Sequence, residues 1–295
     1  MSEADWLTEG FEQNRPRLRA VAYRMLGSVA EADDAVQEAW LRLSRSDASG
    51  VDNLSAWLTT IVARVCLNAL RSRNARREEP MGVHVPDPVV SRADTPSPED
   101  EALLADSVGL ALNVVLETLA PAERLAFVLH DMFDLPFDEI GPMVGRSPAA
   151  ARQLASRARR RVRGADVQAP DSDISRQREA VDAFFAAAHN GDFDALVAVL
   201  HPDVVLRSDG GTALPAASMV LRGAAAVARR TLEIALPTAP KRPVLVNGAA
   251  GVVIILGDRP VAILGFTVAR GKIVEIDAII DPDRLGGLDP AVYAG

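Results

Sequence analysis

The chain has 295 residues, a net charge of −8 and 48% hydrophobic side chains, so it can bury sizeable cores in two or three domains and is not expected to be disordered. Its single cysteine, Cys66, excludes an internal disulfide framework and suits a reducing, cytoplasmic setting. The first ten residues carry three acids, and no apolar stretch is long enough to cross a bilayer, so neither a secretory signal nor a membrane anchor is expected.

The acidic side chains are unevenly distributed along the chain. Residues 78–106 carry eight acidic side chains and one basic one, whereas residues 1–77 carry ten acidic and eleven basic ones. Seven arginines fall between Arg146 and Arg163. The sequence therefore places a basic element, of the kind that attracts phosphate groups, inside an acidic protein.

Residues 11–77 form the first predicted domain, which is helical. Its helices run from Arg15, with Pro16 in the first turn, to Arg77, with breaks at Gly27-Ser28 and at residues 46–50. Two polar sets stand out on these helices, and each alone also fits charges that complement a helix dipole. The first, near a helix start, comprises Asp33, Asp34, Gln37 and Glu38. The second, mostly basic, comprises Trp57, Arg64, Asn68, Arg71 and Arg73.

Two linkers are predicted from composition. Residues 78–106 are acidic and rich in proline, and they show no hydrophobic periodicity, which is typical of a linker. Residues 167–175 are short and polar and join the second domain, at residues 107–164, to the rest of the chain. The chain is therefore expected to hold three folded parts in series.

A helix-turn-helix pattern closes the second domain. A short amphipathic helix leads into a turn at Gly145, after which Ser147 is expected to cap a helix that has Pro148 at its first position. Two helices joined by a tight glycine turn, the second one basic, are typical of DNA-binding proteins, although a solvated basic helix is the alternative. The side chains expected to contact DNA are Arg146, Ser147, Arg152, Gln153, Ser156, Arg157 and Arg160.

The pattern of hydrophobic residues changes after the second linker, and residues 174–285 predict an α+β domain. Two helices, at about 176–190 and 195–200, precede Val- and Ile-rich stretches that predict strands at residues 204–207, 244–246, 252–256, 261–268 and 273–280. His201, Asp203 and Asp209 would line the pocket of an enzyme, but His201-Pro202-Asp203 is also a plain turn. No catalytic set, metal cluster or cofactor motif is evident, so none of these is expected.

In this order, the acidic helix, the basic helix and the helix-turn-helix resemble the extracytoplasmic-function sigma factors of RNA polymerase, over residues 11–163. The resemblance implies that Asp33 to Glu38 lie in region 2.2, which docks on the β′ subunit of the polymerase. It implies that residues 55–77 open and read the −10 promoter element. It also implies that the segment from Leu119-Ala120-Pro121-Ala122-Glu123-Arg124 to the helix-turn-helix is region 4, which reads the −35 element.

The C-terminal domain resembles the NTF2-like, SnoaL-type cone, and the whole chain resembles group 41, or sigma-J type, of the sigma family. That group carries a glycine-rich loop after the first strand, which Asp209-Gly210-Gly211 matches in part. It also carries an Asn-Pro-Asp-Lys-Leu motif near its end, which Asp281-Pro282-Asp283-Arg284-Leu285 matches in part. The first match lacks the third glycine and the lysine of the group's motif. The resemblance implies a regulatory contact at Asp209, Gly210, Gly211, Asp281, Pro282, Asp283, Arg284 and Leu285.

These observations predict a multidomain transcription initiation factor that is not an enzyme. It is expected to bind the β and β′ subunits of core polymerase and promoter DNA, without a cofactor or metal. Whether the C-terminal domain also binds a small-molecule ligand is left open by the sequence. The alternatives are a SnoaL-type enzyme or a ligand-sensing repressor with a DNA-binding front end, although a repressor needs only one DNA-reading domain.

Overall fold

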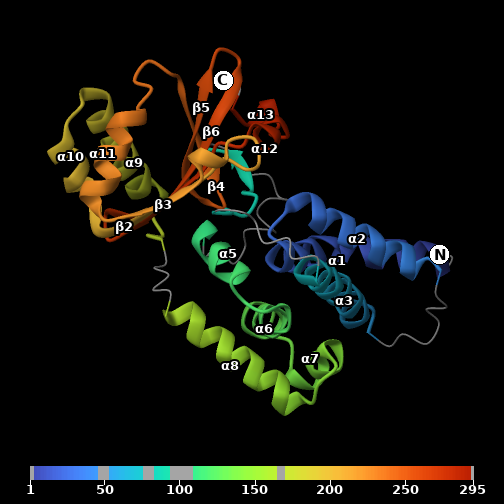
Figure 1. Cartoon of the computed structure of the whole chain (residues 1–295). Coiled ribbons are helices and arrows are strands. Elements are labelled where there is room, and N and C mark those ends of the chain that lie inside the picture. Colours follow the sequence, from blue (N-terminus) through green and yellow to red (C-terminus); the bar gives the residue numbers. More distant parts are fainter. Residues whose placement is uncertain (1–2, 46–52, 76–82, 94–108, 165–169, 294–295) are drawn as a thin grey trace. The chain divides into compact units, whose positions relative to one another are not determined.

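The computed structural model describes residues 3–45, 53–75, 83–93, 109–164 and 170–293, and the chain forms two units (Figure 1). The first unit comprises residues 1–79, 98–106 and 115–166. The second comprises residues 80–97, 107–114 and 167–295. Both units are therefore assembled from segments that are separated in the sequence. No helix among the described residues is long and apolar enough to cross a lipid bilayer.

Three helices begin the first unit: α1 (Glu3–Leu26), α2 (Val29–Leu43) and α3 (Leu54–Ala75). The predicted break at Gly27-Ser28 is confirmed, and Ser28 caps α2. The prediction that the first helix begins at Arg15 is wrong, because α1 begins at Glu3 and Pro16 lies inside it. The earlier turns are held by the buried ring of Phe11, whose centroid lies 4.9 Å from that of Trp40.

Cys66 lies on the buried face of α3. Its side chain is fully buried, and burial raises the pKa of its thiol to about 12. A thiol with so high a pKa stays protonated and unreactive at neutral pH, so Cys66 acts as a small apolar core residue.

The rest of the first unit is also helical. Helix α5 (Gly109–Glu117) begins in the second unit and ends in the first, and it is followed by α6 (Pro121–Phe127), the π-helix η1 (Val128–Met132), α7 (Phe137–Val144) and α8 (Pro148–Gly164). Gly145 ends α7 with a left-handed backbone, φ 67° and ψ 38°, which favours glycine. Ser147 then accepts a hydrogen bond from the backbone N–H of Ala150 at 3.3 Å. The predicted helix-turn-helix is confirmed.

The second unit is built on a seven-stranded sheet with the order β1-β4-β5-β6-β7-β2-β3. All neighbouring strands are antiparallel except β2 and β7, which are parallel. The strands are β1 (Val90–Arg92), β2 (Leu200–Asp209), β3 (Met219–Arg222), β4 (Lys241–Val246), β5 (Ala249–Leu256), β6 (Arg259–Ala269) and β7 (Lys272–Ile279). The helices are α9 (Ile174–Asn190), α10 (Phe193–Val199), α11 (Ala224–Ile234), α12 (Pro282–Gly286) and α13 (Pro290–Tyr293). The predicted α+β class is confirmed.

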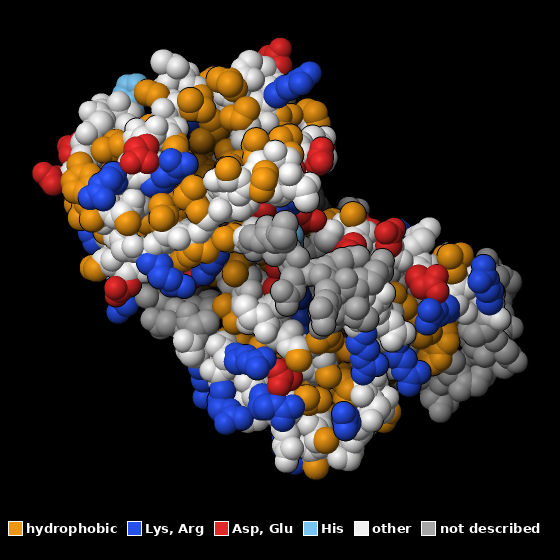
Figure 2. Space-filling model, in the orientation of Figure 1, with side chains coloured by type: hydrophobic (Ala, Val, Ile, Leu, Met, Phe, Trp, Pro, Cys, Tyr) orange, Lys and Arg blue, Asp and Glu red, His pale blue; other side chains and the backbone are white. Residues whose placement is uncertain are grey.

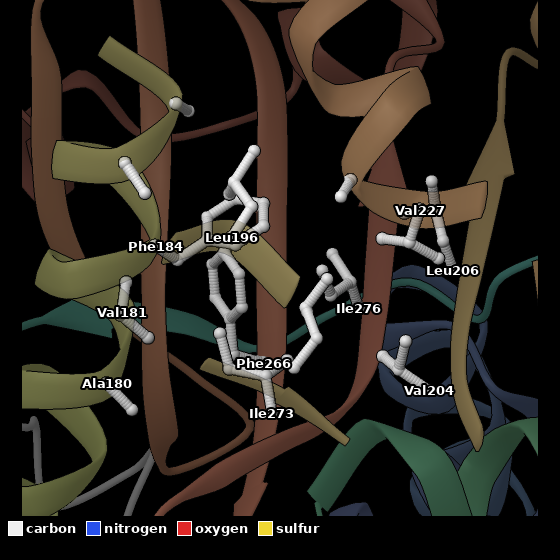
Figure 3. Close-up of a cluster of buried hydrophobic side chains, with 14 of the residues drawn as sticks. Ala180, Val181, Phe184, Leu196, Val204, Leu206, Val227, Phe266, Ile273 and Ile276 are labelled. Atoms are coloured by element: carbon white, nitrogen blue, oxygen red, sulfur yellow. The ribbon is translucent and has the colours of Figure 1, made fainter. Parts of the chain in front are cut away.

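One face of this sheet is covered by α9, α10 and α11. Figure 3 shows Phe184 and Leu196 from these helices pointing toward Phe266 and Ile276 of the strands. The ring of Phe184 meets the ring of Phe266 edge to face, with centroids 5.7 Å apart. This cluster is the main core of the second unit.

The opposite face of the sheet has a core of its own, and part of it comes from early in the chain. Val85 and Leu110 are buried there beside Val246, Ile263 and Leu285. Strand β1, for which the sequence carries no clear signal, pairs with β4, so that Val90 lies opposite Val246. Residues 83–92, within the range expected to be a linker, are therefore part of the C-terminal sheet domain.

Candidate functional sites

The exposed face of α8 carries the side chains that the sequence predicts to contact DNA. Gln153, Ser156, Arg157 and Arg160 are exposed, while Ala151, Ala155 and Ala158 are buried against the other helices of this domain. Arg146 and Arg152 are exposed as well. Figure 2 shows basic side chains gathered over this part of the chain, and all of them are arginines because residues 1–240 hold no lysine. The face therefore combines cations with an amide, which suits phosphate and base contacts together.

Three arginines of α8 are oriented by acids that the sequence reasoning missed. Buried Glu123 of α6 accepts one hydrogen bond from Arg157 and one from Arg161, each at 2.7 Å. Asp131 pairs with Arg159 at 2.5 Å. The guanidinium of Arg157 is therefore held in place before any DNA arrives, whereas Gln153 has no such tether among the hydrogen bonds of the described residues.

The basic set on α3 divides between two faces. Arg64, Asn68 and Arg71 are exposed and follow one another at helical spacing, with Trp57 half-buried on the same side. Arg73 lies elsewhere, because it donates to the carbonyl oxygen of Leu26 and pairs with Glu31 at the start of α2. Arg73 thus fastens α3 to α2, and the first four side chains form the free face.

The acidic set on α2 is likewise split by its partners. Asp33 pairs with Arg19 of α1 at 2.5 Å, and Glu38 pairs with Arg42 one turn later at 2.8 Å. Asp34 and Gln37 are exposed, and neither has a hydrogen bond or ion pair among those described. These two side chains are the most available for a partner.

The two partial motifs of the C-terminal domain come together around the early segment of the chain. We call Asp209 and Arg284, which hold Val85 and Asp87 of the linker, the linker clamp. One carboxylate oxygen of Asp209 accepts from the backbone N–H of Val85 at 2.9 Å and from Arg284 at 2.8 Å. Arg284 also donates to the carbonyl oxygen of Val85 at 2.7 Å and pairs with Asp87 at 2.7 Å. The clamp therefore binds both the backbone and a side chain of residues 83–92.

The glycines and the second motif shape the loop that presents Asp209. A Cβ on Gly211, whose φ is 59°, would lie 1.9 Å from a carboxylate oxygen of Asp281, and one on Gly210 would lie 2.1 Å from the carbonyl oxygen of Leu214. Only glycine fits such approaches. Asp281 caps α12, with Pro282 at its first position, while Asp283 is exposed and Leu285 enters the core of the opposite face. The close approach of the two motifs depends on these small residues.

Asp209 is held in its charged form. Burial alone would raise the pKa of Asp209, but hydrogen bonds from His84 and from the N–H groups of Val85 and Gly211, together with the charge of Arg284, lower it to about 2. A carboxyl group with a depressed pKa stabilises the folded state above its unfolded pKa, near 4, and loses this contribution as the pH falls toward 2.

The Asp209→Asn variant should therefore lose about 1–3 kcal/mol of unfolding free energy at pH 7, because a charge-assisted bond to Arg284 disappears. The deficit should persist down to about pH 4 and shrink below it, as Asp209 of the unsubstituted protein becomes protonated. Urea titrations between pH 7 and pH 3 measure this, with Asp283→Asn as the control, since Asp283 is exposed. A deficit that grows as the pH falls would contradict this prediction.

The acids and histidine considered for an enzyme do not converge. The ring of His201 accepts a hydrogen bond from the backbone N–H of Asp203 at 3.2 Å, which is a local contact at the start of β2. A buried polar group that the sequence reasoning missed lies on β2 and β7, where Arg207 pairs with Asp277 at 3.1 Å and with Glu275 at 3.2 Å. Burial raises the pKa of Asp277 to about 6, against the opposing effect of Arg207. In the described ranges, no group of three His, Cys, Asp or Glu residues is placed to hold a metal ion.

Comparison with known proteins places both helical parts in one family. Residues 11–76 match the model of sigma-70 region 2, and residues 110–162 match that of sigma-70 region 4. The chain is 40% identical to the ECF RNA polymerase sigma factor SigJ of Mycobacterium tuberculosis over 289 residues, which is 94% of this chain and 92% of that protein. It is 34% identical to the probable ECF sigma factor SigI of the same species over the full length of both.

A solved structure agrees with these matches. The crystal structure of SigJ from Mycobacterium tuberculosis superimposes with a TM-score of 0.78 at 38% identity, covering 96% of this chain and 99% of that one. The similarity thus includes the C-terminal α+β unit as well as the two helical domains. Neither a repressor nor an enzyme with a DNA-binding front end is supported. The chain belongs to the extracytoplasmic-function sigma factors of RNA polymerase.

Proposed function

We propose that the C-terminal unit of this sigma factor is an intramolecular regulator that acts by holding the linker between the two promoter-reading domains. In the same proposal, Asp34 and Gln37 on α2 dock on the β′ subunit, the exposed face of α3 reads the −10 element, and α8 reads the −35 element. Polymerase binding draws these domains apart along the promoter, which requires the linker to leave the clamp.

The linker clamp is the observation that carries this proposal. Three polar contacts and the burial of Val85 fix residues 83–92 on a sheet whose other strands begin at residue 200. A bound linker and a linker extended on polymerase exclude each other, so the clamp competes with holoenzyme assembly. Any change that weakens the clamp therefore raises the affinity for core polymerase.

Contacts within the first unit also hold the two promoter-reading domains together. Arg124 of α6 is buried and donates from its Nε to the carbonyl oxygen of Arg24 on α1 at 3.0 Å. Burial lowers the pKa of Arg124 to about 10. Arg17 of α1 also donates to the carbonyl oxygen of Phe133 at 3.0 Å. These contacts join the two promoter-reading domains directly, and they too have to open on a promoter.

A regulatory rather than a catalytic role for the C-terminal unit is supported by how its polar groups are used. Asp209 is occupied by the clamp, and Arg207, Asp277 and Glu275 pair with one another. His201 and Asp203 form a local turn. These groups have structural partners, which is why we place their function in regulation.

Arg284→Ala tests the competition between clamp and polymerase. The variant should raise transcription from a cognate promoter at limiting sigma factor by about threefold or more, because clamp contacts worth at least about 1 kcal/mol are lost. Thermolysin, which cuts beside apolar side chains, should also cleave residues 83–92 faster. Asp283→Ala is the matched control on the same helix. Unchanged transcription together with faster cleavage would show that releasing the linker does not regulate the protein.

The free protein should be a weak DNA binder. Residues 1–77 carry eleven basic and ten acidic side chains, and residues 78–106 carry eight acids, so few counterions are released on DNA binding. A gel shift on one promoter fragment, with the free protein and with holoenzyme, measures the difference. Tight specific binding by the free protein would contradict the need for polymerase.

A further inference from the structure

A cavity opens into the main core of the C-terminal unit, between α9, α11 and the sheet. Its volume is about 370 Å³, and its walls include Phe184, Leu206, Leu264 and Ile276. A dry cavity of about 150 Å³ with similar walls is enough to bind benzene. The cavity therefore has room for two or three fused rings. None of the clamp residues lines it.

The mouth of the cavity is unusually apolar. Leu214, Ile234 and Leu236 line it and are 45%, 53% and 47% exposed, and they are three of the six large hydrophobic side chains exposed among the described residues. Figure 2 also shows hydrophobic side chains reaching the surface of this unit. An apolar rim around a concave apolar site is typical of a ligand-binding pocket.

The lining combines two cations with a few other polar groups. Arg230 and Lys241 contribute to the walls beside His189, Ser208 and Thr231, whereas none of the described Asp or Glu residues does. The Nε of Arg230 is buried without a hydrogen-bond partner among the described residues, and its Nη1 donates to the exposed Glu233 at 3.3 Å. Lys241 donates to the carbonyl oxygens of Leu236, Pro237 and Ala239, which pins the loop at the mouth and leaves its charge there. A buried donor without a partner calls for an acceptor on the ligand.

We propose that this pocket binds an amphiphilic organic anion, with a body of two or three rings in the cavity and one anionic group at Arg230. The apolar walls take the rings, and the guanidinium supplies the charge-assisted hydrogen bonds. The site is separate from the clamp, and the proposal stands whether or not the C-terminal unit regulates transcription.

Two fluorescent probes that differ mainly by one anionic group test this proposal on the full-length protein. 1-Anilinonaphthalene-8-sulfonate should bind at least about tenfold more tightly than the neutral N-phenyl-1-naphthylamine, because only the sulfonate engages Arg230. Arg230→Met should remove most of this preference and leave the neutral probe unaffected. Arg229→Met is the matched control, since Arg229 is exposed on the same helix and does not line the cavity.

Two further variants separate this pocket from unspecific apolar binding. Ala278→Phe places a ring in the cavity from β7 and should weaken both probes by about tenfold or more. Leu236→Ser at the mouth should weaken both probes. Leu256→Ser should not, because Leu256 is an exposed leucine that lies outside the lining. Far-ultraviolet circular dichroism establishes that each variant is folded. Probe binding that survives Ala278→Phe and Leu236→Ser, or that shows no preference for the sulfonate, would overturn the proposal.

Discussion

Reversing one charge at Asp34 should nearly abolish holoenzyme assembly while leaving the fold intact. Asp34 is exposed on α2 and has no ion pair among those described, so Asp34→Lys removes nothing from the folded protein beyond a helix-dipole term of at most about 1 kcal/mol. Placing a cation where an acid meets a basic partner costs several kcal/mol, so the affinity for core polymerase should fall by about 100-fold or more. Co-elution with core polymerase on gel filtration, and the Tm of the free variant, measure the two effects.

The choice of Asp34 over Asp33 follows from the structure. Asp33 pairs with Arg19, so its reversal would set two cations side by side and lower stability as well. Asp182→Lys on α9 is the matched control, because it changes the net charge equally at another exposed helical site. If Asp34→Lys and Asp182→Lys assemble equally well, then α2 is not the docking helix.

Gln153→Ala should cost the holoenzyme about 1–3 kcal/mol of binding free energy at a cognate promoter and so lower transcription from it. The variant should also relax the preference at one base pair of the −35 element. Glutamine can form two hydrogen bonds to an adenine edge in the major groove. Gln153 is exposed early on α8 and is not tethered to another helix among the described residues. Transcription from a set of promoters substituted at each −35 position measures this effect.

Arg160 provides the comparison, because it lies exposed further along α8. Arg160→Ala should weaken binding about equally on every promoter and reduce the salt dependence by about one counterion, as expected of a phosphate contact. If Gln153→Ala also weakens all promoters equally, then Gln153 contacts the phosphate backbone and does not read a base.

The parts of the fold that depend on neighbouring residues were predictable from the sequence. Gly145 to Pro148 specify the turn of the helix-turn-helix through the φ of glycine and the cap of serine, both of which act within four residues. The strands β5, β6 and β7 were predictable because their Val and Ile runs are bounded by turns. Helix α11, which begins after Gly223 with three alanines, was missed, although that run of alanines is a usable signal.

The features that were missed depend on contacts distant in the sequence. Strand β1 has only three residues, too few to show a period of two, and the amide oxygen of Asn247 that binds the N–H of Val89 lies 158 residues away. Glu123 looks like an ordinary acid in the first turn of α6 until α8 folds back and places Arg157 and Arg161 beside it. One sequence read by itself carries no information about such pairs.

The position of β1 also bears on how the protein is made. The ribosome releases residues 83–92 long before their sheet partners, and the 158 residues between Val89 and Asn247 take roughly 8–30 s to synthesise at about 5–20 residues per second. The second sigma domain is completed within that interval, while the strand residues that Val85 packs against, from Val244 to Ile279, are not yet made. A nascent chain of this protein therefore passes through a state with a free linker, in which, under the proposed function, polymerase meets these ten residues before the clamp has formed.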